Sequence, residues 1–296
     1  MIDFLQRLLT LGQNEGAVPL PPPAPSKEPT PLPLPEEVAK EYLDWFHALR
    51  KPAVALKPDP SLPIEPKGSR LFGPAFLPDS EEWPKGPNDV PLEMVAQVNL
   101  ADCKTLEGYP GSGVLQFFIG RDDLYGADFD DLLRGNFLVR CLADDCEGSL
   151  HPVPPLEVIG DDPFSEYSPA RDNDLRARGV TLVPEPIEDM IDLSVDEAST
   201  RFRELPDNYD LDPLYDALDE LLLERSSGHH TGGYPAFVQA DIREHGQYLE
   251  YDHVLLRLTS DKYLMWGDVG ECVFMIPSAD LAKAEFSRVV YSWDCS

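Results

Sequence analysis

The sequence predicts an α+β protein rich in strands, and three observations lead to this class. Apolar residues at helical spacing are confined to a few segments. Short runs of β-branched and aromatic residues, separated by turn residues, recur along the chain. Several of these runs appear twice in the same order, which predicts two internally duplicated β halves with a few flanking helices. With 296 residues, of which 42% are hydrophobic, the chain is long enough to bury a substantial core.

The elements follow from spacing and from turn residues. Apolar residues at helical spacing predict a helix that begins near Glu36 and ends before Pro52. A second helix is expected to begin at Asp212, which suits a helix cap, with Pro213 in its first turn, and to end at Gly228. Strands are predicted over residues 93–100, 113–119, 136–142, 156–159, 236–240, 253–259, 271–276 and 288–292.

The duplication rests on three ordered matches. Residues 113–119 align without a gap on residues 270–276, at an offset of 157. Residues 98–100 match residues 256–258, and residues 74–76 match residues 235–237, at offsets of 158 and 161. We therefore predict one body over residues 36–296, with related halves at about 66–145 and 230–296 and an acidic helical insert at about 161–228.

Residues 1–35 differ from this body. Met1–Leu11 has the pattern of a short amphipathic helix, and the proline-rich stretch up to residue 35 is expected to form a flexible arm. The sequence shows no signal-peptide pattern and no apolar run long enough to span a membrane. Its five cysteines fit reduced thiols, so we expect a cytoplasmic protein.

The net charge of −30 bears on the class of partner. It disfavours nucleic acids and anionic membranes, and it favours a cationic protein partner or serves solubility alone. Between residues 161 and 225, 19 acidic residues stand against six arginines. The outer face of the second predicted helix carries the carboxylates that we expect to bind a partner: Asp216, Asp219, Glu220 and Glu224.

Phosphate-binding loops, dinucleotide fingerprints and nucleophile elbows are absent from the sequence. The spacing of Cys141, Cys146 and His151 does not fit a zinc site, and we expect neither a metal ion nor a cofactor. Two loops remain as candidates, with no catalytic residue assigned in either. One holds His229 and His230, and the other is a glycine-rich turn with Trp266, Asp268 and Glu271, which a hairpin also explains.

A set of motifs resembles the YwqG-like family, which is mainly bacterial and has no agreed reaction. They are Gly73-Pro74-Ala75-Phe76, Ala96-Gln97-Val98-Asn99-Leu100, Gly113-Val114-Leu115-Gln116-Phe117-Phe118, Gly232-Gly233-Tyr234-Pro235 and Trp266-Gly267-Asp268. The resemblance covers about residues 66–296, and it transfers no catalytic residue. Some relatives are encoded beside secreted toxins and their immunity proteins, so the resemblance hints at a toxin as partner.

From the charge and the resemblance together we predict a non-enzymatic acidic binding protein, of the immunity type, that neutralises a basic, nuclease-like toxin. The alternative is a hydrolase or metal-dependent enzyme that uses the His229/His230 and Asp268/Glu271 regions. A pocket in which several titratable groups converge would favour the enzyme, and a broad acidic face would favour the binding protein.

Overall fold

The computed structural model describes residues 30–155, 168–223 and 228–296. The chain divides into two compact units, Met1–Leu32 and Pro33–Ser296, and nearly all of the described residues belong to the second unit. The helix predicted for Met1–Leu11 and the strand predicted for residues 156–159 lie outside the described residues.

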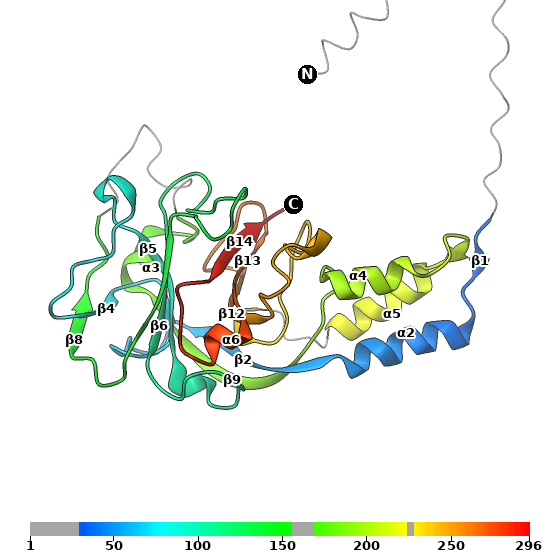
Figure 1. Cartoon of the computed structure of the whole chain (residues 1–296), viewed down its shortest axis with the longest axis horizontal. Helices are drawn as coiled ribbons and strands as arrows, with labels where there is room; N and C mark the ends of the chain where they lie inside the picture. Colours follow the sequence, from blue (N-terminus) through cyan, green and yellow to red (C-terminus); the bar gives the residue numbers. More distant parts are fainter. Residues whose placement is uncertain (1–29, 156–167, 224–227) are drawn as a thin grey trace, which may run out of the picture. The chain divides into compact units, whose positions relative to one another are not determined.

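The second unit is built around one large antiparallel sheet (Figure 1). Its ten strands are β2 (Arg50–Asp59), β3 (Arg70–Leu71), β5 (Glu93–Asn99), β6 (Val114–Ile119), β7 (Phe137–Leu142), β9 (Val180–Met190), β11 (His230–Gly232), β12 (His253–Thr259), β13 (Glu271–Ile276) and β14 (Val290–Asp294). Their spatial order is β14-β13-β12-β11-β2-β9-β3-β5-β6-β7. Four strands therefore stand on each side of the central pair, β2 and β9.

The sheet curves until its two edge strands approach each other and it is nearly a barrel. Phe137 of β7 and Tyr291 of β14 have ring centroids 5.3 Å apart, and the N–H of Tyr291 donates to the carbonyl of Leu132. The main core fills the inner face of this curve. Its largest fully buried side chains include Phe72, Phe117, Phe274 and Trp266.

The remaining elements flank the sheet. They are the strands β1 (Leu32–Pro33), β4 (Ala75–Pro78), β8 (Gly148–His151) and β10 (Tyr209–Asp210), the helices α2 (Glu36–Ala48), α3 (Asn173–Arg178), α4 (Asp196–Arg203), α5 (Asp212–Leu223) and α6 (Ser278–Leu281), and the 3₁₀ turns Pro87–Asp89, Leu100–Cys103 and Glu244–Gly246. Strand β4 pairs with β8 in a small separate sheet.

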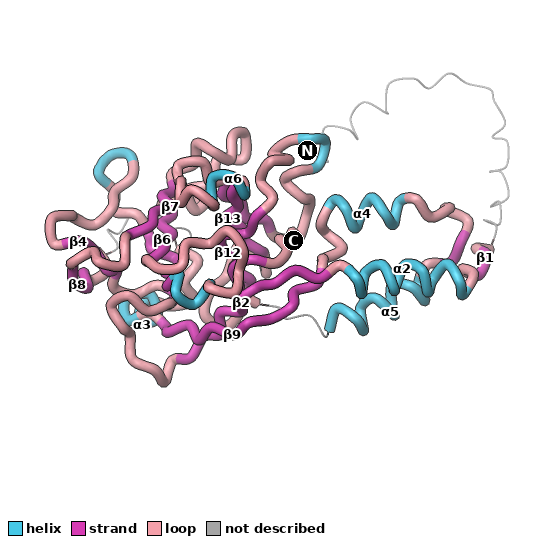
Figure 2. Tube along the Cα trace, turned by 60° about the horizontal axis from the view of Figure 1, so that its bottom comes forward, coloured by secondary structure: helices cyan, strands magenta, loops and turns pink. Residues whose placement is uncertain are grey.

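Helices α2, α4 and α5 lie together beyond one end of the long β2–β9 ribbon (Figures 1 and 2). They form a second core around Tyr42, Phe46, Phe202, Leu214 and Leu218. None of the helices in the described residues is both long and apolar enough to cross a bilayer.

The central strands were not predicted because they contain prolines. Pro58 in β2 and Pro184 in β9 each lie in the middle of the sheet, where proline is normally excluded. The N–H of Leu56 points toward β11 and that of Leu182 toward β3, because each donates to the residue that precedes that strand. Pro58 and Pro184 each follow two residues later, so their nitrogens point to the same side, toward β11 and β3 respectively. At these positions the short neighbouring strand has already ended, so it offers no carbonyl that would need a donor. No ladder hydrogen bond is lost there.

Two further predictions need correction. Residues 236–240 form no strand, since the N–H groups of Val238 and Gln239 donate to the side chain of Asp294 instead of to a neighbouring strand. The last strand is Val290–Asp294 and not 288–292. The strands predicted at 93–100, 113–119, 136–142, 253–259 and 271–276 are confirmed to within one residue at each end.

Candidate functional site

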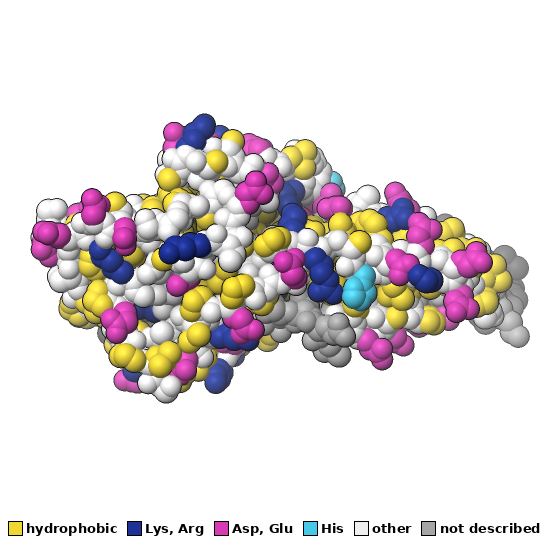
Figure 3. All heavy atoms as spheres, turned by 90° about the horizontal axis from the view of Figure 1, so that it is seen from below, with side chains coloured by type: hydrophobic (Ala, Val, Ile, Leu, Met, Phe, Trp, Pro, Cys, Tyr) yellow, Lys and Arg dark blue, Asp and Glu magenta, His cyan; other side chains and the backbone are white. Residues whose placement is uncertain are grey.

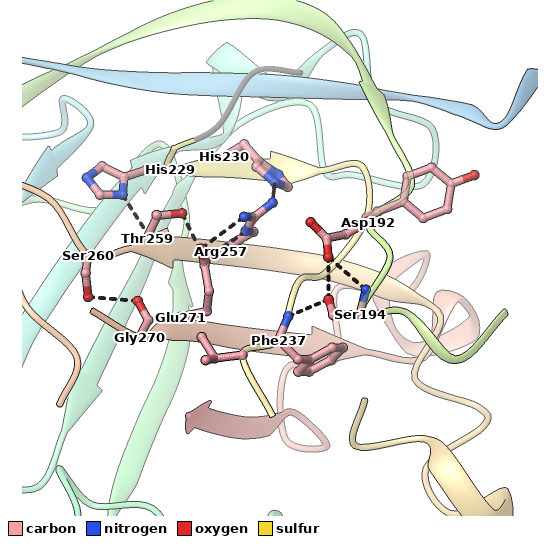
Figure 4. Close-up of polar contacts among 12 residues, drawn as sticks. Asp192, Ser194, His229, His230, Phe237, Arg257, Thr259, Ser260, Gly270 and Glu271 are labelled. Atoms are coloured by element: carbon pink, nitrogen blue, oxygen red, sulfur yellow. Dashed lines mark hydrogen bonds and ion pairs between the residues drawn. The ribbon is translucent and has the colours of Figure 1, made fainter. Parts of the chain in front are cut away.

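The structure brings two of the predicted site residues into one buried polar cluster, through a residue that was not predicted. Strand β11 carries His230 between β2 and β12, and β12 places Arg257 directly opposite it. Glu271 opens the next strand, β13, and its carboxylate meets the guanidinium of Arg257 (Figure 4). Sheet pairing therefore assembles the cluster, which neither loop could have formed alone.

Arg257 and Glu271 form a two-pronged ion pair. The distances are 3.0 Å from Nε to Oε2 and 3.1 Å from Nη2 to Oε1, and the hydroxyl of Thr259 also donates to Oε2 at 3.0 Å. Arg257 is only 3% exposed. Burial alone would lower the pKa of this guanidinium, but Glu271, with Asp192 and Asp189 nearby, raises it. The cation is therefore firmly charged inside the protein.

The imidazole of His230 has a contact at each of its two ring nitrogens. Nδ1 lies 3.0 Å from the carbonyl oxygen of Gly232, which can only accept. Nε2 lies 3.4 Å from Nη1 of Arg257, which can only donate, and 3.9 Å from the carboxylate of Asp189. Both nitrogens have partners and the residue is 1% exposed, so this histidine could reach a substrate only after the cluster opened.

His229 belongs to a different contact. Its Nδ1 accepts from the N–H of Thr259 at 3.3 Å, and its Nε2 lies 3.5 Å from Oδ2 of Asp261. Burial would raise the pKa of the Asp261 carboxyl, but His229 and the N–H groups of Tyr263 and Leu264 outweigh this effect, and the pKa is lowered. The two adjacent histidines thus face separate carboxylates.

The other residues of the glycine-rich turn do not join the cluster. Trp266 is fully buried and packs edge-on against Tyr125 at 5.7 Å. Asp268 is exposed in the turn before β13, while the side chain of Glu271 turns to Arg257. Asp268 and Glu271 therefore do not form the carboxylate pair that the sequence suggested, and the glycine-rich turn connects the chain to β13.

The cluster also connects the sheet to the helices. Asp189, near the end of β9, is fully buried and accepts from the N–H of Tyr234 at 2.8 Å. Three residues further, Asp192 accepts from Ser194, whose hydroxyl accepts from the N–H of Phe237 at 2.9 Å. These bonds fix the chain where it leaves β9 for α4, which gives the cluster a positioning role.

Arg257, Asp189 and Thr259 were missed by sequence reasoning. One signal was present, because Arg257 interrupts the apolar run of β12 and so had to be buried with a partner. Asp189 gave no such signal, since it follows Glu185 and Glu188 in a stretch that reads as an acidic surface.

The predicted acidic residues lie elsewhere, on α5. Asp216 and Glu220 are exposed, Asp219 is on the same helix, and Glu224 lies outside the described residues. Asp212, Asp216 and Glu220 are spaced four apart, so they form one row along the helix. Within the described part of the chain, none of the three has an ion-pair partner. Acidic side chains are frequent over the helices in Figure 3.

A hollow of about 990 Å³ opens beside β3 and is lined by acidic residues that include Asp79, Asp102, Asp145 and Glu147. Arg70 also lines it, but its guanidinium is occupied. It donates to the carbonyls of Glu65, Gly68 and Pro74 and to Gln97, and burial lowers its pKa to about 10. Across the described residues, no group of three or more His, Cys, Asp or Glu side chains could hold a metal ion.

Residues 69–295 match the model of a family described as a domain of unknown function, DUF1963. The chain belongs to the DUF1963 family. The match begins one residue before β3 and ends one residue after β14, so the buried cluster and α5 lie within the DUF1963 region. The 990 Å³ hollow lies only partly within it, because residues 64–68 also line the hollow. Strand β2 and helix α2 precede it. No curated protein matches the chain.

Proposed function

We propose that this DUF1963 protein is a non-enzymatic binding protein that docks a basic protein partner on the outer face of α5. The observation that carries the proposal is the row of Asp212, Asp216 and Glu220, which runs along the helix without a cation among the described residues. Like charges four residues apart repel one another and weaken a helix, so a partner with basic side chains would relieve this repulsion.

An aromatic anchor stands within the same surface. Tyr215 is 43% exposed and its ring stacks on Phe202, with centroids 5.4 Å apart and planes at 18°. Stacking holds the ring in one orientation, so little side-chain entropy is lost when a partner covers it. Tyrosine rings of this kind often supply most of the affinity of an interface, while surrounding charges mainly raise the association rate.

The finer proposal concerns the partner and the location. A nuclease-like toxin needs a basic surface to hold phosphate groups, and a row of carboxylates competes for that surface. An immunity-type role in the cytoplasm of the producing cell, and kinship with the YwqG-like family, belong to this proposal. The buried, fully paired state of His230, Arg257 and Glu271 supports a positioning role for the cluster over the alternative of an enzyme.

The test is association kinetics with the basic protein recovered together with the full chain. We expect the association rate to fall steeply with salt, and to fall when Asp212, Asp216 and Glu220 are changed to Asn, Asn and Gln. Tyr215→Ala should mainly speed dissociation. The matched control changes three exposed carboxylates of the 990 Å³ hollow, with Asp79→Asn, Asp145→Asn and Glu147→Gln, which alters the net charge equally. An association rate insensitive to salt and to the α5 variant, or equally lowered by the control, would overturn the proposal.

The four strands on each side of the β2–β9 pair form two outer strand groups, β11–β14 and β3, β5, β6 and β7. Their pairing also supports the prediction that one β unit was duplicated. Arg70 pairs with Gln97 and Gln97 with Gln116 on one side of the sheet, as His230 pairs with Arg257 and Arg257 with Val273 on the other. The register shift in β5 falls between Met94 and Ala96, and that in β12 between Val254 and Leu256. In β5 the shift ends one residue before Gln97, and in β12 it ends one residue before Arg257. One β unit used twice explains both shifts.

A further inference from the structure

Lys51 is an exposed lysine near the start of β2, and its amine forms no ion pair with a carboxylate of the described residues. Three other lysines are held in ion pairs with acidic side chains: Lys40 with Asp44, Lys57 with Glu185 and Lys85 with Glu82. Nζ of Lys51 instead lies 4.3 Å from the centroid of the Tyr234 ring. This contact leaves the nitrogen unblocked by any carboxylate.

Tyr234 offers Lys51 a neutral ring and no negative charge. Its side chain is buried, and burial, together with the charges of Glu197 and Asp189, raises its pKa to about 12. The phenol therefore keeps its proton at neutral pH. A cation over a neutral ring is held less firmly than one in a hydrogen-bonded ion pair, so the amine of Lys51 can leave the ring to react.

The surroundings of Lys51 favour its neutral amine over its ammonium form. Partial burial lowers the pKa of this lysine, and the nearby cation of Arg243 adds to the effect. Together they outweigh the carboxylates that act in the opposite direction, which are those of Glu197, Asp252 and Asp189. A lowered pKa gives more free amine at neutral pH, and the free amine is the form that attacks electrophiles.

Lys51 also lines a pocket of about 240 Å³, together with Pro52, Leu106 and Val254. Small-molecule sites usually measure roughly 300–1,000 Å³, so this pocket suits a small group carried on a lysine better than a whole ligand. The other titratable residues of the lining are Glu107, Tyr109, Asp252 and His253. Because the carboxylates among them repel an anionic donor such as an acyl phosphate, an uncharged thioester fits the surroundings better.

We propose that Lys51 is an acylation site, whose amine takes a small acyl group from a thioester. The amine attacks the thioester carbonyl, a C–N bond forms, the C–S bond breaks, and the thiolate leaves with the proton that the nitrogen loses. The product is a neutral amide, which is less costly to bury than an ammonium group. Lys51 stands opposite the fully buried Asp189 in the β2–β9 register, so acylation removes a cation close to the buried cluster. The proposal is independent of docking at α5, because it concerns another surface and needs no protein partner.

The probe is S-acetyl-N-acetylcysteamine, a small uncharged thioester, incubated at limiting amount with the full-length chain. Peptide mass spectrometry then measures the acetylation rate at each lysine. At about pH 7.5 we expect Lys51 to react at least about threefold faster than Lys104, an exposed lysine that serves as the control. A tenfold larger fraction of free amine is partly offset by the weaker nucleophilicity of a less basic nitrogen, which leaves about threefold.

Two further measurements separate this explanation from simple exposure. The preference for Lys51 should shrink as the pH rises toward about 10.4, where ordinary lysines also lose their protons. Glu197→Gln removes an exposed carboxylate that stabilises the ammonium form, so it should speed acetylation of Lys51 and leave the rate at Lys104 unchanged. The proposal would be overturned by equal rates at Lys51 and Lys104 near neutral pH, or by a preference for Lys51 that neither the pH nor Glu197→Gln alters.

Discussion

Phe117 in β6 and Phe274 in β13 are in contact, with ring centroids 5.0 Å apart and planes at 57°. The two residues hold the same position in the two outer strand groups, since Phe117 pairs with Ala96 and Phe274 with Leu256, each directly after the register shift. If a two-fold axis relates the groups, a residue that contacts its own counterpart must lie beside that axis. The curvature of the sheet brings the two groups face to face at this point.

This contact predicts energetic coupling between the two rings. Phe117→Leu and Phe274→Leu should each destabilise the protein, and the double variant should cost less than the sum by about 0.5–1.5 kcal/mol, the usual worth of an aromatic pair. Urea unfolding of the four proteins measures this. Phe118→Leu is the control, because Phe118 points to the opposite face and packs on Trp83. A coupling as large between Phe118 and Phe274 would contradict the assignment of faces.

The strands that were predicted correctly share one property, which is that their period-two or continuous apolar pattern is uninterrupted by proline. β5, β6, β12 and β13 are of this kind. β2 and β9 were missed because Pro58 and Pro184 are tolerated only thanks to the shortness of β11 and β3, a property of the neighbours that no local pattern contains.

The buried cluster was hidden from sequence reasoning for a related reason. His230 and Glu271 were singled out as members of two separate loops, and the residue that joins them, Arg257, lies in a third segment. Register between strands distant in sequence placed them together. The exposed row on α5, in contrast, follows from helical spacing alone and was predictable.

Gly233 allows close packing beside the cluster and should not tolerate a side chain. Its φ is +70°, and a Cβ there would lie 2.6 Å from Oδ2 of Asp189, which is itself fixed by Tyr234. Gly233→Ala should therefore cost backbone strain plus about 1–3 kcal/mol of overpacking. Gly246→Ala is the matched control, because its φ is +80° and nothing lies within 4 Å of the added Cβ. Equal losses in thermal unfolding would show that Asp189 moves freely.

Acid sensitivity should depend on the His229–Asp261 contact. The pKa of Asp261 is lowered in the folded chain, so this carboxylate stabilises the fold above its unfolded pKa of about 3.8, and this contribution is lost as the pH falls through the folded value. Asp261→Asn cannot be protonated, so it should not lose this stability as the pH falls. The free energy of unfolding of the variant should therefore depend less steeply on pH below about 4. Asp268→Asn, an exposed change in the next turn, should keep the wild-type slope. Identical slopes in all three proteins would exclude the role given to Asp261.

Arg257 should be the residue whose loss is most damaging outside the apolar core. Arg257→Met removes the guanidinium but keeps much of its apolar volume, so Glu271 and the fully buried Asp189 lose their shared cation. Removing one partner of a buried ion pair typically costs about 3–5 kcal/mol. The control is Arg288→Met, whose side chain is 53% exposed in its ion pairs with Glu250 and Asp280 and should contribute only about 0–1 kcal/mol. Adding Glu271→Gln to Arg257→Met should recover part of the loss, because the unpaired charge at Glu271 is removed. If Arg257→Met costs no more than Arg288→Met in urea unfolding, the cluster does not hold the sheet together as the contacts indicate.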